Sequence, residues 1–131
     1  MNGLNYLLDT NFILGLLKSS PETLALINDR QVCAHQCAYS AITRMELLGF
    51  PGITRAEETL IQTKLERLTY LPITTAVEDA AILLRRTRKV KLPEAIIAAS
   101  ALIVGVELLT MDRQLQNIVT EEQTRPKTQE D

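Results

Sequence analysis

The chain has 131 residues, which is the length of one folded domain with a single substantial core. Hydrophobic residues make up 46% and charged residues 23%, as in an ordinary globular protein, and no apolar run approaches the roughly 20 residues of a membrane helix. No secretory signal pattern is visible, so a cytoplasmic protein is expected, and the net charge of −2 neither indicates nor excludes a nucleic-acid partner.

Hydrophobic periodicity and turn signals predict strands that alternate with helices along the whole chain. In chain order they are a strand over 4–8, helices over 10–20 and 21–30, a strand over 32–39, helices over 41–48 and 55–68, a strand over 68–73, helices over 75–89 and 93–104, a strand over 106–110 and a short helix over 112–118. Ser40 is the predicted cap of the third helix, and Thr75 with Glu78 forms a capping-box pattern for the fifth.

This alternation predicts an α/β domain whose parallel sheet, of four to five strands, is covered by helices on both faces. One domain is expected over residues 1–122, and the polar residues 123–131 are expected to form a disordered tail. Ligands of such sheets bind beyond the carboxyl ends of the strands, so acids at those ends are candidates for a site.

Two cysteines, Cys33 and Cys37, flank His35, the one histidine of the chain. If they lie on a strand, their separation of about 13 Å excludes both a disulfide and a shared zinc ion. A structural role is therefore predicted for all three residues.

Four acids occupy places at or near the ends of apolar segments. Asp9 and Asp112 directly follow the first and last predicted strands, where each is either a helix cap or a site residue. Glu94 begins an apolar helix, where the helix dipole alone accounts for an acid. Glu46 lies six residues beyond Ser40, too far to be its capping partner, so a functional role is predicted for it.

If the fold gathers these four acids, their mutual repulsion raises their pKa values unless a cation lies among them. Carboxylate oxygens are ligands that suit Mg²⁺ or Mn²⁺, which activate water and neutralise charge on a phosphodiester. The cluster therefore implies a metal site.

The motifs that contain these acids resemble those of the PIN-domain family, in particular the VapC-type ribonuclease toxins of bacterial toxin–antitoxin pairs. In chain order they read "LLDTNFIL", "SAITRMELLGF", "LPEAIIAASAL" and "LLTMDRQL". The resemblance implies a three-layer α/β/α sandwich and metal-dependent endonucleolytic cleavage of RNA. It also implies a homodimer, a small antitoxin partner, and catalytic and metal-binding roles for Asp9, Glu46, Glu94 and Asp112.

Two further residues match frequent polar companions in the family, and one acid departs from its pattern. Asn11 and Thr110 would be supporting residues. Glu94 stands where the family usually has aspartate, and its extra methylene moves the carboxylate outward by about 1.5 Å. Weaker metal binding, a preference for Mn²⁺ and loss of activity are the alternatives, the last of which would make the protein a PIN-like binding module for RNA or protein.

A basic run lies directly before Glu94, over residues 85–91. Arg85, Arg86 and Arg88 are the candidate contacts to the RNA backbone. The alternative is a solvated helix end whose cations complement the helix dipole.

Overall fold

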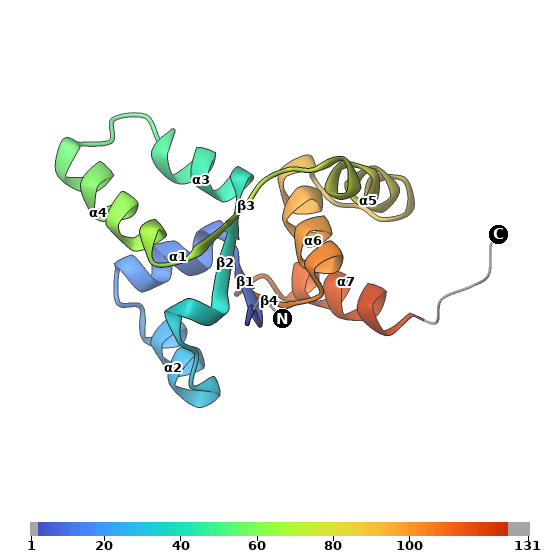
Figure 1. Cartoon of the computed structure of the whole chain (residues 1–131), viewed down its shortest axis with the longest axis horizontal. Coiled ribbons are helices and arrows are strands. Elements are labelled where there is room, and N and C mark those ends of the chain that lie inside the picture. The colour runs from blue at the N-terminus through green and yellow to red at the C-terminus, as the bar shows by residue number, and fades with distance from the viewer. Residues whose placement is uncertain (1–2, 126–131) are drawn as a thin grey trace.

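Four short parallel strands form one sheet at the centre of the molecule (Figure 1). The computed structural model describes residues 3–125. The strands are β1 (Tyr6–Leu8), β2 (Cys37–Ser40), β3 (Thr69–Leu71) and β4 (Glu107–Leu109), in the order β3-β2-β1-β4. β1 is thus central, and Leu7 pairs with Ala38 on one side and with Leu108 on the other. This order places the carboxyl ends of β1 and β4 side by side.

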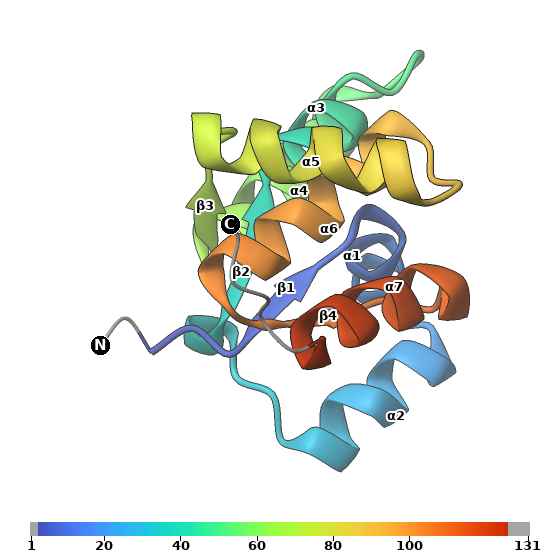
Figure 2. The same ribbon diagram turned by 90° about the vertical axis from the view of Figure 1, so that its right-hand side faces the viewer.

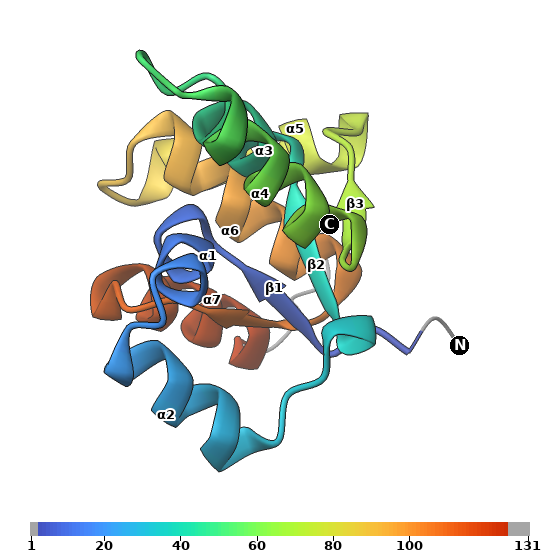
Figure 3. The ribbon, with the colours of Figure 1, turned by 90° about the vertical axis from the view of Figure 1, so that its left-hand side faces the viewer.

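Helices cover both faces of the sheet, which confirms the predicted three-layer α/β/α sandwich (Figures 2 and 3). One layer contains α1 (Thr10–Leu17), α2 (Pro21–Arg30), α3 (Ala41–Leu48) and α4 (Arg55–Glu66), and the other contains α5 (Thr75–Thr87), α6 (Leu92–Val104) and α7 (Arg113–Thr124). The period-2 alternation of strand side chains divides the core accordingly. Leu7 and Leu108 pack toward α5–α7, whereas Leu8 and Leu109 pack toward α1–α4.

The strand predicted over 32–39 is wrong in its first half. Ala34–Gln36 forms a 3₁₀ turn, because the Gln36 side chain accepts a hydrogen bond from the backbone N–H of Cys33 at 2.9 Å. This turn brings the sulfur of Cys37 within 3.5 Å of the Cys33 carbonyl oxygen, so the extended spacing predicted for the two residues does not hold.

The two cysteines are nevertheless free thiols with different surroundings. Cys37 lies in the core, as a structural role predicts, and burial raises the pKa of its thiol to about 11. Cys33 and His35 are exposed, so no packing role is seen for them.

Two helix boundaries also differ from the predictions. Thr74, one residue earlier than predicted, caps α5 by accepting from the backbone N–H of Val77 at 3.2 Å. α7 continues to Thr124, since the Gln123 amide donates to the Val106 carbonyl at 2.7 Å and fastens the last turn to the domain. The domain therefore extends past residue 122, and residues 126–131 of the predicted tail lie outside the described residues. None of the helices in the described part is both long and apolar enough to cross a membrane.

We expect Gly15→Ala to lower the free energy of unfolding by about 1–3 kcal/mol, as overpacking of a closed interface does. α1 and α2 approach so closely here that a Cβ on Gly15 would lie 2.2 Å from Oγ1 of Thr23, which is buried. Urea unfolding would measure the loss. Adding Thr23→Ala removes the clashing hydroxyl and should recover part of it; a double variant as unstable as the sum of both single variants would contradict this explanation.

Candidate active site

Asp9 lies at the junction of β1 and α1 and is almost completely enclosed, with 6% of its surface exposed. Its Oδ1 accepts a hydrogen bond from the backbone N–H of Phe12 at 2.8 Å, which caps α1. Its Oδ2 accepts from the hydroxyl of Thr110, which follows the neighbouring strand β4. Thr110 therefore holds the Asp9 carboxylate in place, as expected of a supporting residue.

The environment of Asp9 raises the pKa of its carboxyl group. Burial is the main cause, and the negative charges of Asp112 and Glu46 add to it, while the hydrogen bonds from Thr110 and Phe12 act in the opposite direction. The charges of three acids that are far apart in the sequence therefore interact at this edge of the sheet.

Glu46 is exposed on α3, and a threonine of α1 orients its carboxylate. The Thr10 hydroxyl lies 2.6 Å from Oε1 of Glu46 and 3.0 Å from the hydroxyl of Thr43, which is fully buried on α3. Neither Thr10 nor Thr43 is among the site residues predicted from the sequence. The one signal available was a polar residue on the buried face of α3, three positions before Glu46.

Glu94 lies in the first turn of α6, where the sequence predicts an acid that serves the helix start. Its Oε1 atom is buried and has no hydrogen-bond partner among the described residues. Asp112 contrasts with it, because its Oδ1 accepts from the backbone N–H of Leu115 at 3.1 Å and caps α7. An unpaired buried carboxylate oxygen is costly, and a cation in contact with it would remove that cost.

The four predicted acids surround one pocket of about 170 Å³. Its lining residues are Asp9, Thr10, Asn11, Glu46, Pro93, Glu94, Ile97, Asp112 and Leu115. The structure thus brings together all four acids and the supporting residue Asn11 at the carboxyl ends of β1 and β4. Their catalytic role stays a prediction.

The pocket fits a hard divalent cation in the chemistry of its donors, which are carboxylate oxygens, one of them unpaired. Within residues 3–125, however, no three His, Cys, Asp or Glu side chains are arranged to hold an ion. Asp9 and Asp112 cap helices, and Glu46 turns toward Thr10. Ion binding therefore requires side-chain rotation, for which the exposed Glu46 and Asp112 have the freedom.

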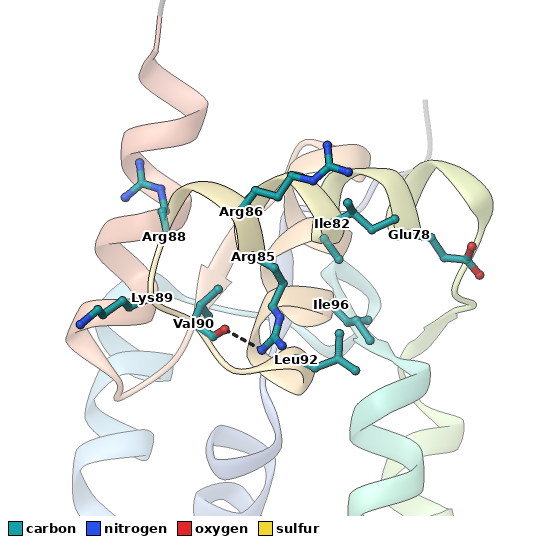
Figure 4. A pocket seen from close by; sticks show the side chains of 10 residues that line it. Glu78, Ile82, Arg85, Arg86, Arg88, Lys89, Val90, Leu92 and Ile96 are labelled. Atoms are coloured by element: carbon teal, nitrogen blue, oxygen red, sulfur yellow. Dashed lines mark hydrogen bonds between the residues drawn. The ribbon is translucent and has the colours of Figure 1, made fainter.

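None of the three predicted RNA-binding arginines lines the acid pocket. Arg88 forms ion pairs with Glu121 and Glu122 of α7, at 2.8 and 2.9 Å, which raise the pKa of its guanidinium group. Arg85 donates to the Val90 carbonyl at 3.0 Å, whereas Arg86 extends away from the loop between α5 and α6 (Figure 4). Two of the three arginines thus have partners within the fold.

Two lysines of the same basic run, which are not among the predicted RNA-binding residues, lie closer to the acids. Lys89 and Lys91 line a second pocket of about 240 Å³, which shares Glu94 and Asp112 with the acid pocket. The signal was their position in the sequence, since Lys91 precedes Glu94 by only three residues.

We expect Arg88→Ala to lower the free energy of unfolding by about 1 kcal/mol, the upper end for an ion pair at a surface. The guanidinium group joins the loop after α5 to α7, and Glu122 is the better enclosed partner, with 14% of its side chain exposed against 62% for Glu121. In double-mutant cycles, Glu122→Gln should therefore couple to Arg88→Ala more strongly than Glu121→Gln does. Equal coupling would show that burial does not decide the strength of these pairs.

Comparison with known proteins shows which family this chain belongs to. The model of the PIN domain matches residues 6–120. A toxin–antitoxin complex from Klebsiella pneumoniae aligns with a TM-score of 0.73 and 27% identity, over 84% of this chain and 88% of the other. FitAcB from Neisseria gonorrhoeae aligns with a TM-score of 0.70 and 21% identity, over 88% and 93% of the two chains.

VapBC2 from Rickettsia felis, bound to a DNA fragment from its promoter, shares the fold at a TM-score of 0.70 and 17% identity, over 88% of this chain and 93% of the other. Among curated protein sequences, none is significantly similar to this chain. The family match spans all four strands and the segments that contain the four acids. The chain therefore belongs to the PIN-domain family.

Proposed function

We propose that this protein is a metal-dependent endoribonuclease and the toxin of a toxin–antitoxin pair. The observation that carries the proposal is the convergence of four acids on one pocket, with the unpaired Oε1 of Glu94 among them. PIN-domain toxins are nucleases in general, and the Klebsiella pneumoniae structure is a toxin–antitoxin complex. A small antitoxin is therefore the proposed protein partner, and a homodimer is the proposed assembly.

Asp9, Glu46, Glu94 and Asp112 would hold Mg²⁺ or Mn²⁺. Such an ion, when bound, activates water and neutralises charge on the phosphodiester. The chain itself holds Asp9 in place through Thr110. Glu46, which accepts a hydrogen bond from Thr10 in this structure, would rotate toward the ion. Pro93, Ile97 and Leu115 contribute the apolar part of the pocket wall.

The second candidate is a PIN-like binding module without catalytic activity. One observation favours it, because no three of these acids are arranged to hold an ion in the described part of the chain. The longer side chain of Glu94, where the family usually has aspartate, is consistent with a site that has lost activity.

Cleavage of labelled single-stranded RNA by the purified protein separates the two candidates. We expect cleavage with Mg²⁺ or Mn²⁺ and none with a chelator. Calorimetric titration with Mn²⁺ measures ion binding independently of activity. Binding of RNA without cleavage, together with no heat of Mn²⁺ binding near physiological concentrations, would establish the binding module instead.

A further inference from the structure

The basic run between α5 and α6 contains cations of two different kinds. Arg88 is bound to Glu121 and Glu122 on α7, and Arg85 reaches beneath the loop to the Val90 carbonyl (Figure 4). Arg85 therefore fastens the loop over residues 88–91 to α5, and Arg88 fastens it to α7. Lys89 and Lys91 are exposed on this fastened loop, and in the described part of the chain neither forms an ion pair.

The pocket that these lysines line adjoins the acid pocket. Glu94, Asp112 and Leu115 line both, so the two pockets meet along these side chains. Lys91 is the N-cap residue of α6, which has no side-chain cap bond, so its position relative to Glu94 is set by the first turn of that helix. A phosphate beside the acid pocket on this side would therefore lie within reach of the lysines.

Charge determines what can occupy the second pocket. The acid pocket carries four carboxylates, and one divalent ion offsets only two of their charges, so an anionic substrate still meets repulsion there. Two lysines at the adjoining pocket supply the missing positive charge, and the exposed amide of Gln114 adds a hydrogen-bond donor. These groups suit a phosphate oxygen, and contacts to phosphate carry no information about the base sequence.

We propose that Lys89 and Lys91 form a phosphate-binding subsite, which takes the backbone phosphate next to the one placed at the acids. The inference rests on the proposed cleavage of RNA and names the part of the substrate that the second pocket holds. The subsite binds single-stranded RNA independently of its sequence, and the two arginines position the loop without touching the substrate.

The test measures RNA binding and cleavage for Lys89→Ala/Lys91→Ala. Binding of a labelled RNA oligonucleotide is measured with chelator present, in an Asp9→Asn background, over a range of salt concentrations. We expect the affinity to fall about tenfold and the slope of log affinity against log salt to fall by about 0.7, the contribution of one neutralised phosphate on a single strand. Cleavage is measured with Mn²⁺ in the protein that retains Asp9. There, Lys89→Ala/Lys91→Ala should raise KM and leave kcat nearly constant.

The matched controls keep or remove the same number of charges. Lys89→Arg/Lys91→Arg retains both cations and should bind RNA like the parent chain. Arg55→Ala/Lys64→Ala removes two cations from α4, on the other face of the sheet, and should leave the slope unchanged (Figure 1). An unchanged slope and KM in Lys89→Ala/Lys91→Ala, or an equal loss in the α4 control, would overturn the subsite. If the parent chain neither binds nor cleaves RNA, the proposed function fails, and the subsite fails with it.

Discussion

Asp9→Asn is expected to abolish RNA cleavage and, in the same protein, to raise the free energy of unfolding near neutral pH. Asparagine is a good helix cap, so its side-chain oxygen can keep the bond to the Phe12 N–H that begins α1. The variant loses the charge that burial and the two neighbouring acids disfavour. Active sites that gather like charges commonly trade stability for function in this way.

The sign of the pH dependence follows from the direction of the Asp9 pKa shift. The carboxyl pKa in the folded protein is raised above its ordinary value of 3.8, so the folded state retains the proton in a range where the unfolded state has lost it. Wild-type stability therefore falls as the pH rises through that range, and the loss is complete above the folded pKa. The variant escapes this loss, and each pKa unit corresponds to about 1.4 kcal/mol.

Urea unfolding at pH 4 and pH 7, without divalent ions, measures the effect. The free energy of unfolding of Asp9→Asn should exceed that of wild type by more at pH 7 than at pH 4. Mn²⁺ should reduce this difference because the ion stabilises the wild type alone. Asp29→Asn is the matched control, since Asp29 is exposed on α2 and distant from the pocket. A variant that is less stable than wild type at pH 7 would show that the Asp9 hydrogen bonds outweigh the cost of its burial.

Glu94→Gln is expected to reduce kcat by roughly 100-fold or more, as removal of one charge-stabilising group from an active site does. Glutamine preserves the length of the side chain but lacks the negative charge that would meet a cation. The buried Oε1 of Glu94 has no hydrogen-bond partner in the described part of the chain, so the substitution breaks no hydrogen bond of that atom.

A second measurement distinguishes a loss of ion binding from a change in the stability of the fold. A ligand present at 100 times its Kd stabilises the folded state by about 2.7 kcal/mol, so Mn²⁺ should raise the unfolding temperature of wild type and leave that of Glu94→Gln nearly unchanged. Glu94→Asp restores the usual residue of the family and should shift the ion preference toward Mg²⁺, which is less tolerant of a displaced ligand. Equal thermal shifts in wild type and Glu94→Gln would remove Glu94 from the ion site.

Local patterns in the sequence were sufficient for the fold class. Apolar runs predicted all four strands near their observed positions, because the side-chain period of a buried strand is visible without any partner. The error at Ala34–Gln36 arose where a side chain, Gln36, bonds to the backbone and replaces an extended conformation with a turn. Such competition depends on geometry that hydrophobic spacing does not record.

The basic run shows a limit of a different kind. Seven consecutive positions contain five cations of equal formal charge, and only the arginines were predicted to contact RNA. The structure distinguishes them by their partners, since the glutamates that bind Arg88 lie on α7, more than 30 residues away. Which cation faces solvent therefore depends on contacts that form only when the helices pack.

The sequence by itself determined that Asp9 and Asp112 follow strands, that Glu46 lies within a helix and that Glu94 begins one, since each statement depends only on neighbouring residues. The tertiary structure alone decided that the four acids share one pocket. The strand order places β4 beside β1, so Thr110 bonds to Asp9 across 101 positions of the chain, and α3 packs against α1, so Thr10 meets Glu46. Burial of the Glu94 Oε1 atom, which has no hydrogen-bond partner among residues 3–125, is likewise a result of packing.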